Sequence, residues 1–209
     1  MKRVEYRRCG RGTDMNLTRN TMICYLLGIN LLGFVLQGID VLLRWKGKNN
    51  RMCIPVMIAS VLGASPGILL CMLLFDRRAV KENMMCRVFA VCMPVIQGLL
   101  AAIFLNRNGR PVTLSFWDFF AARPWLAVYL AAINLATFFL FGMDKRRAVK
   151  QKRRIRIVTL LGCSFIGGAA GGLAGMYLFR HKTRKNYFTL GLPLMLVMQA
   201  VVIFFVMNL

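Results

Sequence analysis

Acidic residues and histidine are scarce in this chain of 209 residues, which has seven Asp and Glu residues and one histidine. Metal centres and acid–base pairs need several carboxylate, imidazole or thiolate groups close together. No stretch of the sequence brings such groups to ligand or catalytic spacing, and no phosphate-binding glycine loop is present. We therefore expect no catalytic residues, no metal and no cofactor.

Closely spaced cysteines are also lacking. None of the seven cysteines belongs to a C-x-x-C motif, and most of them lie in apolar runs. A zinc site or a disulfide framework would need tighter clustering. We interpret these cysteines as small packing residues.

Apolar residues are abundant instead. They make up 58% of the chain, whereas roughly 45–50% is usual for a soluble protein. The net charge of +22 would by itself suggest a nucleic-acid-binding protein. However, the cations stand in short blocks between long apolar runs, as do membrane-protein loops that face anionic headgroups. This placement favours membrane lipids as partners and argues against nucleic acid.

Six apolar segments follow one another, and each has about the 20 residues needed to cross a hydrocarbon core. They run over residues 22–43, 53–75, 88–105, 124–143, 157–179 and 188–207. The first is too long for a signal peptide and shows no A-x-A cleavage site, so we expect it to be an uncleaved span. Met15 is an alternative start. The fold class predicted is an all-α membrane protein built as a six-helix bundle.

The two halves of the chain are similar at an offset of 104 residues, the distance from Asp40 to Asp144. At this offset Asn30 matches Asn134, Gly-x-Asp matches Gly-x-Asp, and two glycines match two glycines. We predict two related three-helix repeats. The domains expected are a basic tail (1–20), a degenerate repeat (21–105), a connecting loop with an aromatic interfacial segment (106–123) and a second repeat (124–209).

Glycines line the middle segment of each half. They are Gly63 and Gly67 in the first half and Gly167, Gly168, Gly171, Gly172 and Gly175 in the second. Small residues four apart let another membrane helix approach closely. We predict that the two middle helices cross each other along these surfaces, with a ligand path lined by backbone as the alternative.

Topology can be predicted from the distribution of Lys and Arg. Six full spans with a cytoplasmic N-terminus place 18 Lys and Arg residues inside and 11 outside. Three spans per half would insert the second half upside down, as in many secondary transporters. We prefer this arrangement. The alternative has re-entrant hairpins broken at 64–67 and 167–172, which places 20 cations on one side and 9 on the other with the N-terminus outside.

Two aspartates, Asp40 and Asp144, end the first helix of each half. A carboxylate at a helix C-terminus is unfavourable against the helix dipole and calls for cations. In the second half, we expect Lys145, Arg146 and Arg147 to supply them. The interpretation preferred is an interfacial ion pair, and the alternative is a proton- or cation-linked site.

Other polar residues also occur in or beside the apolar segments. Asn30 and Asn134 lie mid-helix, where buried amides usually bond across a bundle; substrate contact is the alternative. The basic cluster Arg180, His181 and Lys182 ends the glycine-rich segment. An enzyme that used Asp144 and His181 is the weakest hypothesis, because no catalytic pair can be assembled from the sequence.

The second half carries a series of short motifs. They are Asp144-Lys145-x-x-Ala148, Gly167-Gly168 and Phe179-Arg180-His181-Lys182, followed by Phe188, Gly191 and Pro193. In these motifs, residues 130–207 resemble the small bacterial membrane proteins grouped as domain of unknown function 1294. One departure is Ile157, where that pattern has Glu. The first half lacks the matching Lys and His, so it resembles a degenerate second copy.

The resemblance implies a bacterial membrane protein without implying a reaction. We expect a multi-pass protein of the bacterial plasma membrane that acts as a scaffold or binds a protein partner, with basic loops on anionic lipid. The alternative is a small transporter or channel with a site between the two repeats. The sequence does not indicate an oligomeric state.

Overall fold

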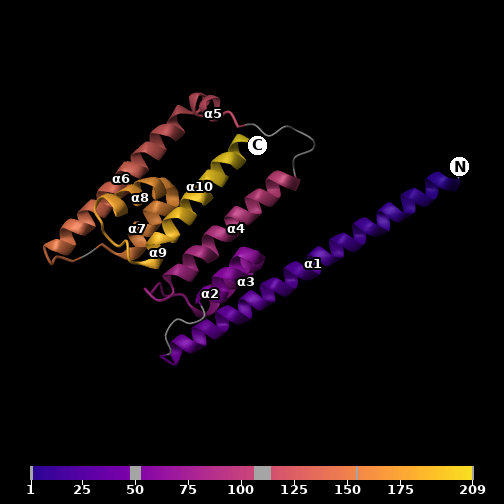
Figure 1. The fold of residues 1–209 in the computed structure, drawn as a ribbon, viewed down its shortest axis with the longest axis horizontal. Coiled ribbons are helices and arrows are strands. Elements are labelled where there is room, and N and C mark those ends of the chain that lie inside the picture. The colour runs from indigo at the N-terminus through magenta and orange to yellow at the C-terminus, as the bar shows by residue number, and fades with distance from the viewer. Residues whose placement is uncertain (1, 48–52, 106–113, 154, 209) are drawn as a thin grey trace. The chain divides into compact units, whose positions relative to one another are not determined.

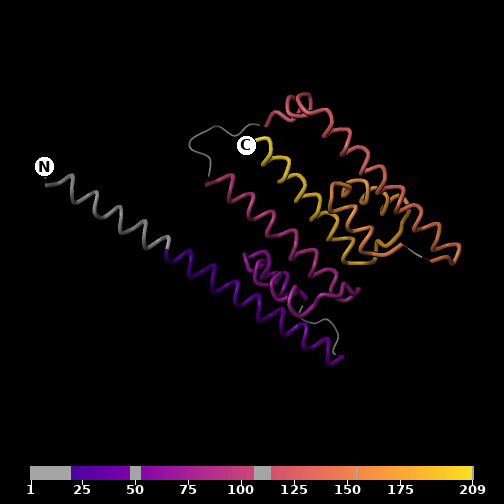
Figure 2. The backbone as a smooth tube through the Cα atoms, turned by 180° about the vertical axis from the view of Figure 1, so that it is seen from behind, coloured from indigo at the N-terminus to yellow at the C-terminus, as the bar shows by residue number. Residues whose placement is uncertain are grey.

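The computed structural model describes residues 2–47, 53–105, 114–153 and 155–208, and it describes side chains from residue 20 onward. Secondary structure within these residues is helical, with no strand among them. The chain divides into two compact units, Met1–Arg77 and Arg78–Leu209, which we describe separately. Figures 1 and 2 show the course of the chain from opposite sides.

The first unit consists of one long helix and a broken second segment. α1 covers Lys2–Trp45. It is followed by α2 (Cys53–Ala59), a π-helical turn (Ser60–Ala64) and α3 (Ser65–Phe75). Both views show α2 and α3 beside the C-terminal part of α1 (Figures 1 and 2).

The second unit begins with α4 (Met84–Leu105), α5 (Phe116–Ala122) and α6 (Pro124–Val149). It continues with α7 (Ile157–Cys163), a π-helical turn (Ser164–Gly168), α8 (Ala169–Leu178), α9 (Asn186–Thr189) and α10 (Gly191–Met207). α10 packs against both α4 and α8. The core of the unit contains Phe141, Phe188 and Leu192, which are fully buried.

Six helical segments in the described chain are long and apolar enough to cross a membrane, which confirms the predicted all-α class. They are Asn20–Trp45, Cys53–Phe75, Met84–Leu105, Pro124–Val149, Ile157–Leu178 and Asn186–Met207. The prediction of two three-helix repeats stays a prediction. α4, the last helix of the expected first repeat, groups with the second unit rather than the first.

The second and fifth of these segments are broken at a single glycine each. Gly63 has φ of 110° and Gly167 has φ of 144°. These values lie in a region that glycine enters readily and residues with a Cβ avoid. Each break lies inside a π-helical turn, so the chain changes direction there instead of continuing as one helix.

Contacts on both sides of each break show the direction that the chain takes. Tyr25 contacts Leu62 and Asn30 contacts Gly67, and both pairs are 37 residues apart. In the second unit Asn134 contacts Gly171, again 37 residues apart. Contacts at a constant separation mean that the two helices run in the same direction. α3 is therefore parallel to α1, and α8 is parallel to α6.

The two ends of the fifth segment lie together. Ile155, just before α7, and His181, just after α8, both contact the carboxylate of Asp144. A straight helix of the 22 residues in this segment would separate its ends by ~33 Å. The segment is therefore a helical hairpin that turns at Gly167. The expectation of a straight fifth span is wrong, because length and hydropathy do not distinguish a hairpin from a crossing helix.

The glycine surfaces pack within each unit. A Cβ at Gly67 would overlap the Asn30 backbone in α1, and one at Gly171 would overlap the Asn134 backbone in α6. A Cβ at Gly175 would come within 2.9 Å of the Phe141 Cβ atom. Close packing at these glycines is observed, but the predicted contact between the two middle helices is wrong, since the first helix of the same unit occupies each surface.

Candidate functional site

Asp144 lies near the end of α6 and has no solvent exposure. Its Oδ1 accepts a hydrogen bond from the backbone N–H of Ile155 at 2.8 Å. Its Oδ2 lies 2.8 Å from Nε2 of His181 and 2.7 Å from Nζ of Lys182. One carboxylate thus joins the end of α6 to both ends of the α7–α8 hairpin.

The turn after α8 aims His181 and Lys182 at this carboxylate. Arg180 and Lys182 have φ of 42° and 63°, and the N–H of His181 donates to the Met176 carbonyl at 3.0 Å. The chain therefore reverses within three residues of the helix end. Lys182 also places its Nζ 4.9 Å from the ring centre of Phe188, so this ammonium is held by an anion and an aromatic ring.

The structure corrects the partners expected for Asp144. Lys145, Arg146 and Arg147 follow it in sequence, but its oxygens contact His181 and Lys182 instead. Arg180 is exposed and Lys145 is half-buried. Three of the predicted site residues, Asp144, His181 and Lys182, therefore come together, while Lys145 and Arg180 do not join them.

A buried carboxylate with three donors is stabilised as an anion and anchors the chain segments that supply those donors. Both of its oxygens are occupied. The arrangement supports the predicted ion pair over a proton- or cation-linked site.

The break at Gly167 is satisfied by side chains from α6 and α10. Asn134 donates from Nδ2 to the Gly167 carbonyl at 3.0 Å and accepts at Oδ1 from the Gly171 N–H at 2.7 Å. Its amide thereby replaces the helical bond between those two residues. The hydroxyl of Tyr129 donates to the Ile166 carbonyl at 2.9 Å, and Gln199 donates to the Ser164 carbonyl at 2.6 Å.

These contacts confirm that Asn134 bonds across the bundle. Backbone freed from a helix is tolerated at membrane depth only where other groups satisfy it. Tyr129 and Gln199 were missed by sequence reasoning. The signal for Tyr129 is its match to Tyr25 at the same offset of 104 residues.

The first unit repeats part of this arrangement. Oδ1 of Asn30 accepts from the Gly67 N–H at 2.8 Å, and the Tyr25 hydroxyl donates to the Leu62 carbonyl at 3.0 Å. At the helix end, Arg44 lies 3.0 Å from Asp40 and 2.9 Å from Asp76. One cation between two carboxylates thus replaces the single carboxylate between two basic side chains.

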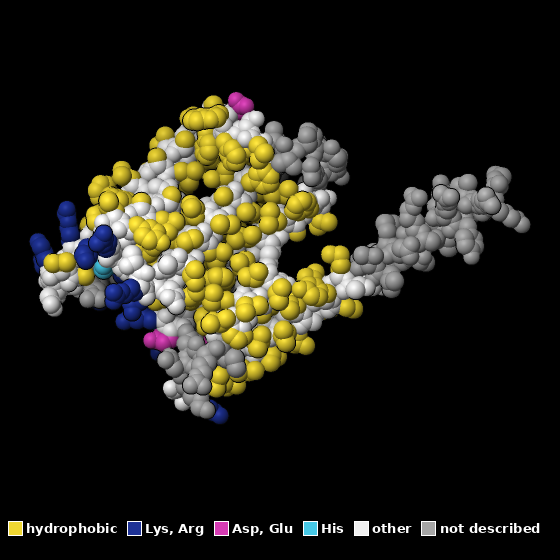
Figure 3. Space-filling view, viewed as in Figure 1, with side chains coloured by type: hydrophobic (Ala, Val, Ile, Leu, Met, Phe, Trp, Pro, Cys, Tyr) yellow, Lys and Arg dark blue, Asp and Glu magenta, His cyan; other side chains and the backbone are white. Residues whose placement is uncertain are grey.

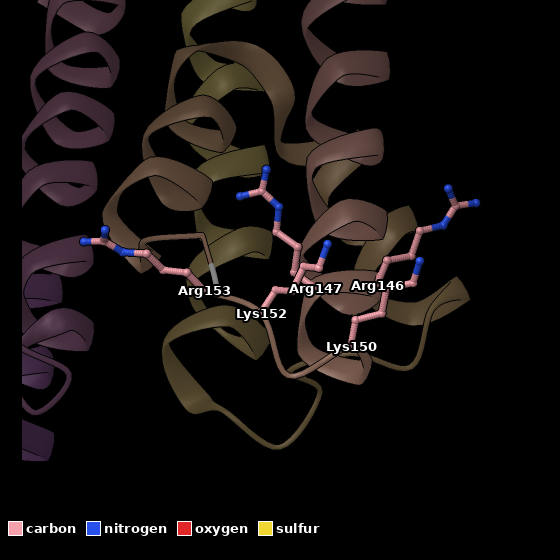
Figure 4. Close-up of a pocket in the computed structure, with 5 residues that line it drawn as sticks. All are labelled: Arg146, Arg147, Lys150, Lys152 and Arg153. Atoms are coloured by element: carbon pink, nitrogen blue, oxygen red, sulfur yellow. The ribbon is translucent and has the colours of Figure 1, made fainter.

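A concave basic surface of about 500 Å³ is lined by residues that follow Asp144 in the chain. We call it the basic surface, and its lining residues are Arg146, Arg147, Lys150, Lys152 and Arg153. They come from the end of α6 and the loop that follows (Figure 4). Figure 3 shows Lys and Arg gathered at this end of α6, whereas hydrophobic side chains cover most of the visible helix faces.

Comparison with known proteins identifies the family to which the chain belongs. The family model described as "Protein of unknown function (DUF1294)" matches residues 134–188. A relative, the uncharacterized protein YsdA of Bacillus subtilis (strain 168), is 44% identical over 78 residues, which are 37% of this chain and 88% of the relative. The chain belongs to this family. No solved structure matches.

The match to the DUF1294 model locates the family within the second unit. It begins at Asn134, which bridges the helix break, and ends at Phe188, which packs on Lys182. All three members of the Asp144 cluster fall inside it. Tyr129 and Gln199 lie outside the matched residues, so the additional hydrogen bonds at the break come from flanking sequence.

Proposed function

We propose that this DUF1294 protein is a scaffold of the bacterial plasma membrane, which binds anionic headgroups through its basic surface and holds a protein partner there. The observation that carries the proposal is the basic surface, where five cations line one concavity without a carboxylate among its lining residues. Each cation near an anionic leaflet contributes about 1 kcal/mol of attraction. The same five cations would also bind an acidic segment of the protein partner.

A revised topology supports this proposal. If both broken segments are re-entrant, only α1, α4, α6 and α10 cross the membrane. The loops that flank the two broken segments then fall on one side, with 20 Lys and Arg residues against 9 on the other. The positive-inside rule assigns the richer side to the cytoplasm. The six Lys and Arg residues of the N-terminal tail then lie outside, unless translation begins at Met15.

Cysteine accessibility tests this topology. Single cysteines are introduced in the loops at 145–153 and 183–185 of a variant whose native cysteines have been replaced by serine or alanine. In intact cells, a membrane-impermeant maleimide is expected to label neither loop, and after permeabilisation it is expected to label both. Labelling of one loop in intact cells and of the other only after permeabilisation would restore the six-span topology.

The scaffold role has its own experiment. The protein is reconstituted in phosphatidylcholine vesicles that contain a minority of fluorescent phosphatidylglycerol, and local enrichment of that lipid is read by energy transfer. We expect enrichment to fall when Arg146, Lys150 and Arg153 are changed to Gln. From bacterial membranes in mild detergent, the native chain should retain a defined partner that this variant loses. Recovery of the chain alone, with unchanged lipid enrichment, would contradict the proposal.

A small transporter remains the second candidate, because broken helices are typical of transporter binding sites. The capping of the break by Asn134, Tyr129 and Gln199 weighs against it, since those freed backbone groups are already bonded. Flux in liposomes that falls on Asn134→Ala or Asp144→Asn would favour transport. Absence of flux across a panel of ions and small solutes would count against it.

A further inference from the structure

A second pocket, of about 750 Å³, lies within the second unit, and His181 and Lys182 are among its lining residues. Its walls come from the chain before and at the start of α4, from the start of α7, and from the segment between α8 and α9. Each of these segments adjoins the end of an apolar helix. In a membrane, helix ends lie at the depth of the lipid headgroups.

Part of the lining of this pocket is basic. Lys81, Arg156, Lys182 and Lys185 line it together with His181, and Glu82 is the single acid among the lining residues. Lys182 and His181 are already bonded to Asp144, so they are fixed in place. Lys81, Arg156 and Lys185 are exposed. The basic part of the lining therefore combines a rigid pair with three solvent-facing cations, which together favour an anion.

Apolar side chains also line the pocket. They include Val80, Met84, Ile157 and Val158, together with Tyr187 from α9. Val80 is 42% exposed and Val158 is 53% exposed, so both present apolar surface to whatever fills the pocket. The basic surface described above has no apolar side chain among its lining residues. The two sites therefore differ in kind, because this pocket suits a ligand that is anionic at one end and apolar at the other.

We propose that this pocket binds one anionic phospholipid, with the phosphate between Arg156, Lys185 and Lys81 and the acyl chains along Val80 and Val158. Basic pockets between membrane helices on the cytoplasmic side are a recognised way to hold acidic headgroups. The proposal rests on the membrane placement proposed above, but it uses other residues than the basic surface does.

The experiment uses the full chain purified in detergent. Phosphatidylglycerol and phosphatidylcholine with identical acyl chains are titrated, and native mass spectrometry counts the molecules retained. The pocket variant carries Lys81→Gln, Arg156→Gln and Lys185→Gln. The matched control carries Arg146→Gln, Lys150→Gln and Arg153→Gln, which removes the same charge from the basic surface. Equal unfolding midpoints will show that both variants are folded.

We expect the native chain to retain one phosphatidylglycerol more tightly than phosphatidylcholine. The pocket variant should lose this preference by roughly 10- to 100-fold, as removal of three cations predicts. The control variant should keep the single tight lipid and lose only weaker additional ones. If the pocket variant keeps the tight lipid, this proposal is overturned, whereas the scaffold proposal fails when the control variant loses no lipid.

Water-soluble probes separate a lipid from a free anion. Glycerophosphoglycerol, which is the headgroup without acyl chains, and inorganic phosphate are tested as competitors. Weak competition by both supports a lipid, because the apolar lining residues then contribute to binding. Val158→Asn should weaken phosphatidylglycerol binding and leave binding of the headgroup unchanged. Competition by inorganic phosphate at the affinity of the lipid would overturn the proposal in favour of a soluble anion site.

Discussion

In both units, matching hydrogen bonds hold the broken segment against the first helix. The ion pairs that join the end of the broken segment to that helix differ between the units. Tyr25 and Asn30 in the first unit contact the broken segment as Tyr129 and Asn134 do in the second. The second unit adds Gln199 at the break. The Tyr and Asn contacts are therefore common to both breaks, whereas the Gln199 contact is particular to the second unit.

The helix that packs against the broken segment, α6 in the second unit and α1 in the first, also differs between the units. Phe141 of the second unit is fully buried and packs against Phe188 with ring centres 5.5 Å apart. At the same offset, the first unit has Gln37, which is fully buried and has neither amide atom hydrogen-bonded within the described residues. The second unit is therefore apolar at the position where the first retains an unsatisfied amide.

The largest effect is expected from filling a glycine surface. Gly171→Leu would force a side chain into the Asn134 carbonyl, a contact that backbone cannot relieve. We expect loss of folded, detergent-extractable protein on size-exclusion chromatography. Gly162→Ala is the control in the same segment, because a Cβ there meets nothing within 4 Å. Normal yield of the Gly171→Leu variant would show that α6 and α8 are not packed as described.

Removal of the carboxylates should distinguish the units next. Asp144→Ala leaves two basic side chains and the Ile155 N–H without their acceptor, and breaking a buried ion pair costs about 3–5 kcal/mol. A fall of roughly 10 °C in the unfolding midpoint is expected for a chain of this size. Asp40→Ala should cost less, since Arg44 keeps Asp76. Equal losses for both variants would mean that the two ion pairs are equivalent.

Removal of the bridging amides should have an intermediate effect. Asn134→Ala frees the Gly167 carbonyl and the Gly171 N–H, at about 1–3 kcal/mol for buried unsatisfied groups. Asn30→Ala frees the Gly67 N–H, so a smaller loss is expected. Thermal unfolding of both variants in one detergent measures the difference. A larger loss for Asn30→Ala would reverse the order that we infer for the two breaks.

The smallest effect is expected at Gln37. Gln37→Leu removes an unsatisfied buried amide and should leave stability unchanged or raise it by about 1 kcal/mol. The reciprocal change, Phe141→Gln, introduces such an amide into the second unit and should lower the unfolding midpoint. If Gln37→Leu destabilises the protein, Gln37 has a partner, and the contrast between the units at this position is removed.

The sequence was sufficient for the helical segments and for the roles of Asn30 and Asn134. The length of an apolar segment and the presence of an amide in its middle can be read from local composition. In a membrane, these two features determine where a helix forms and which side chains bond across the bundle. The close approach at Gly67 and Gly171 was also predictable, because small residues four apart form a flat surface. Which helix fills that surface depends on tertiary structure and was not.

The direction of α3 and α8 could not be obtained from hydropathy. A hairpin and a crossing helix can have the same length and hydropathy, and the break itself is marked by the backbone angle at Gly63 or Gly167. Sequence neighbours also gave the wrong partners for Asp144, since the turn after α8 brings in His181, which is 37 residues away, and Lys182 beside it. The same separation of 37 residues recurs between Asn134 and Gly171.

Closure of the α7–α8 hairpin by Asp144 has a consequence for its dynamics. Because one carboxylate holds the residue before α7 and the residue after α8, neither end can fray without loosening the other. The amides of α7 and α8 should therefore exchange with deuterium together, in a single cooperative opening. Neutralising that one side chain would convert this concerted event into gradual fraying from both ends.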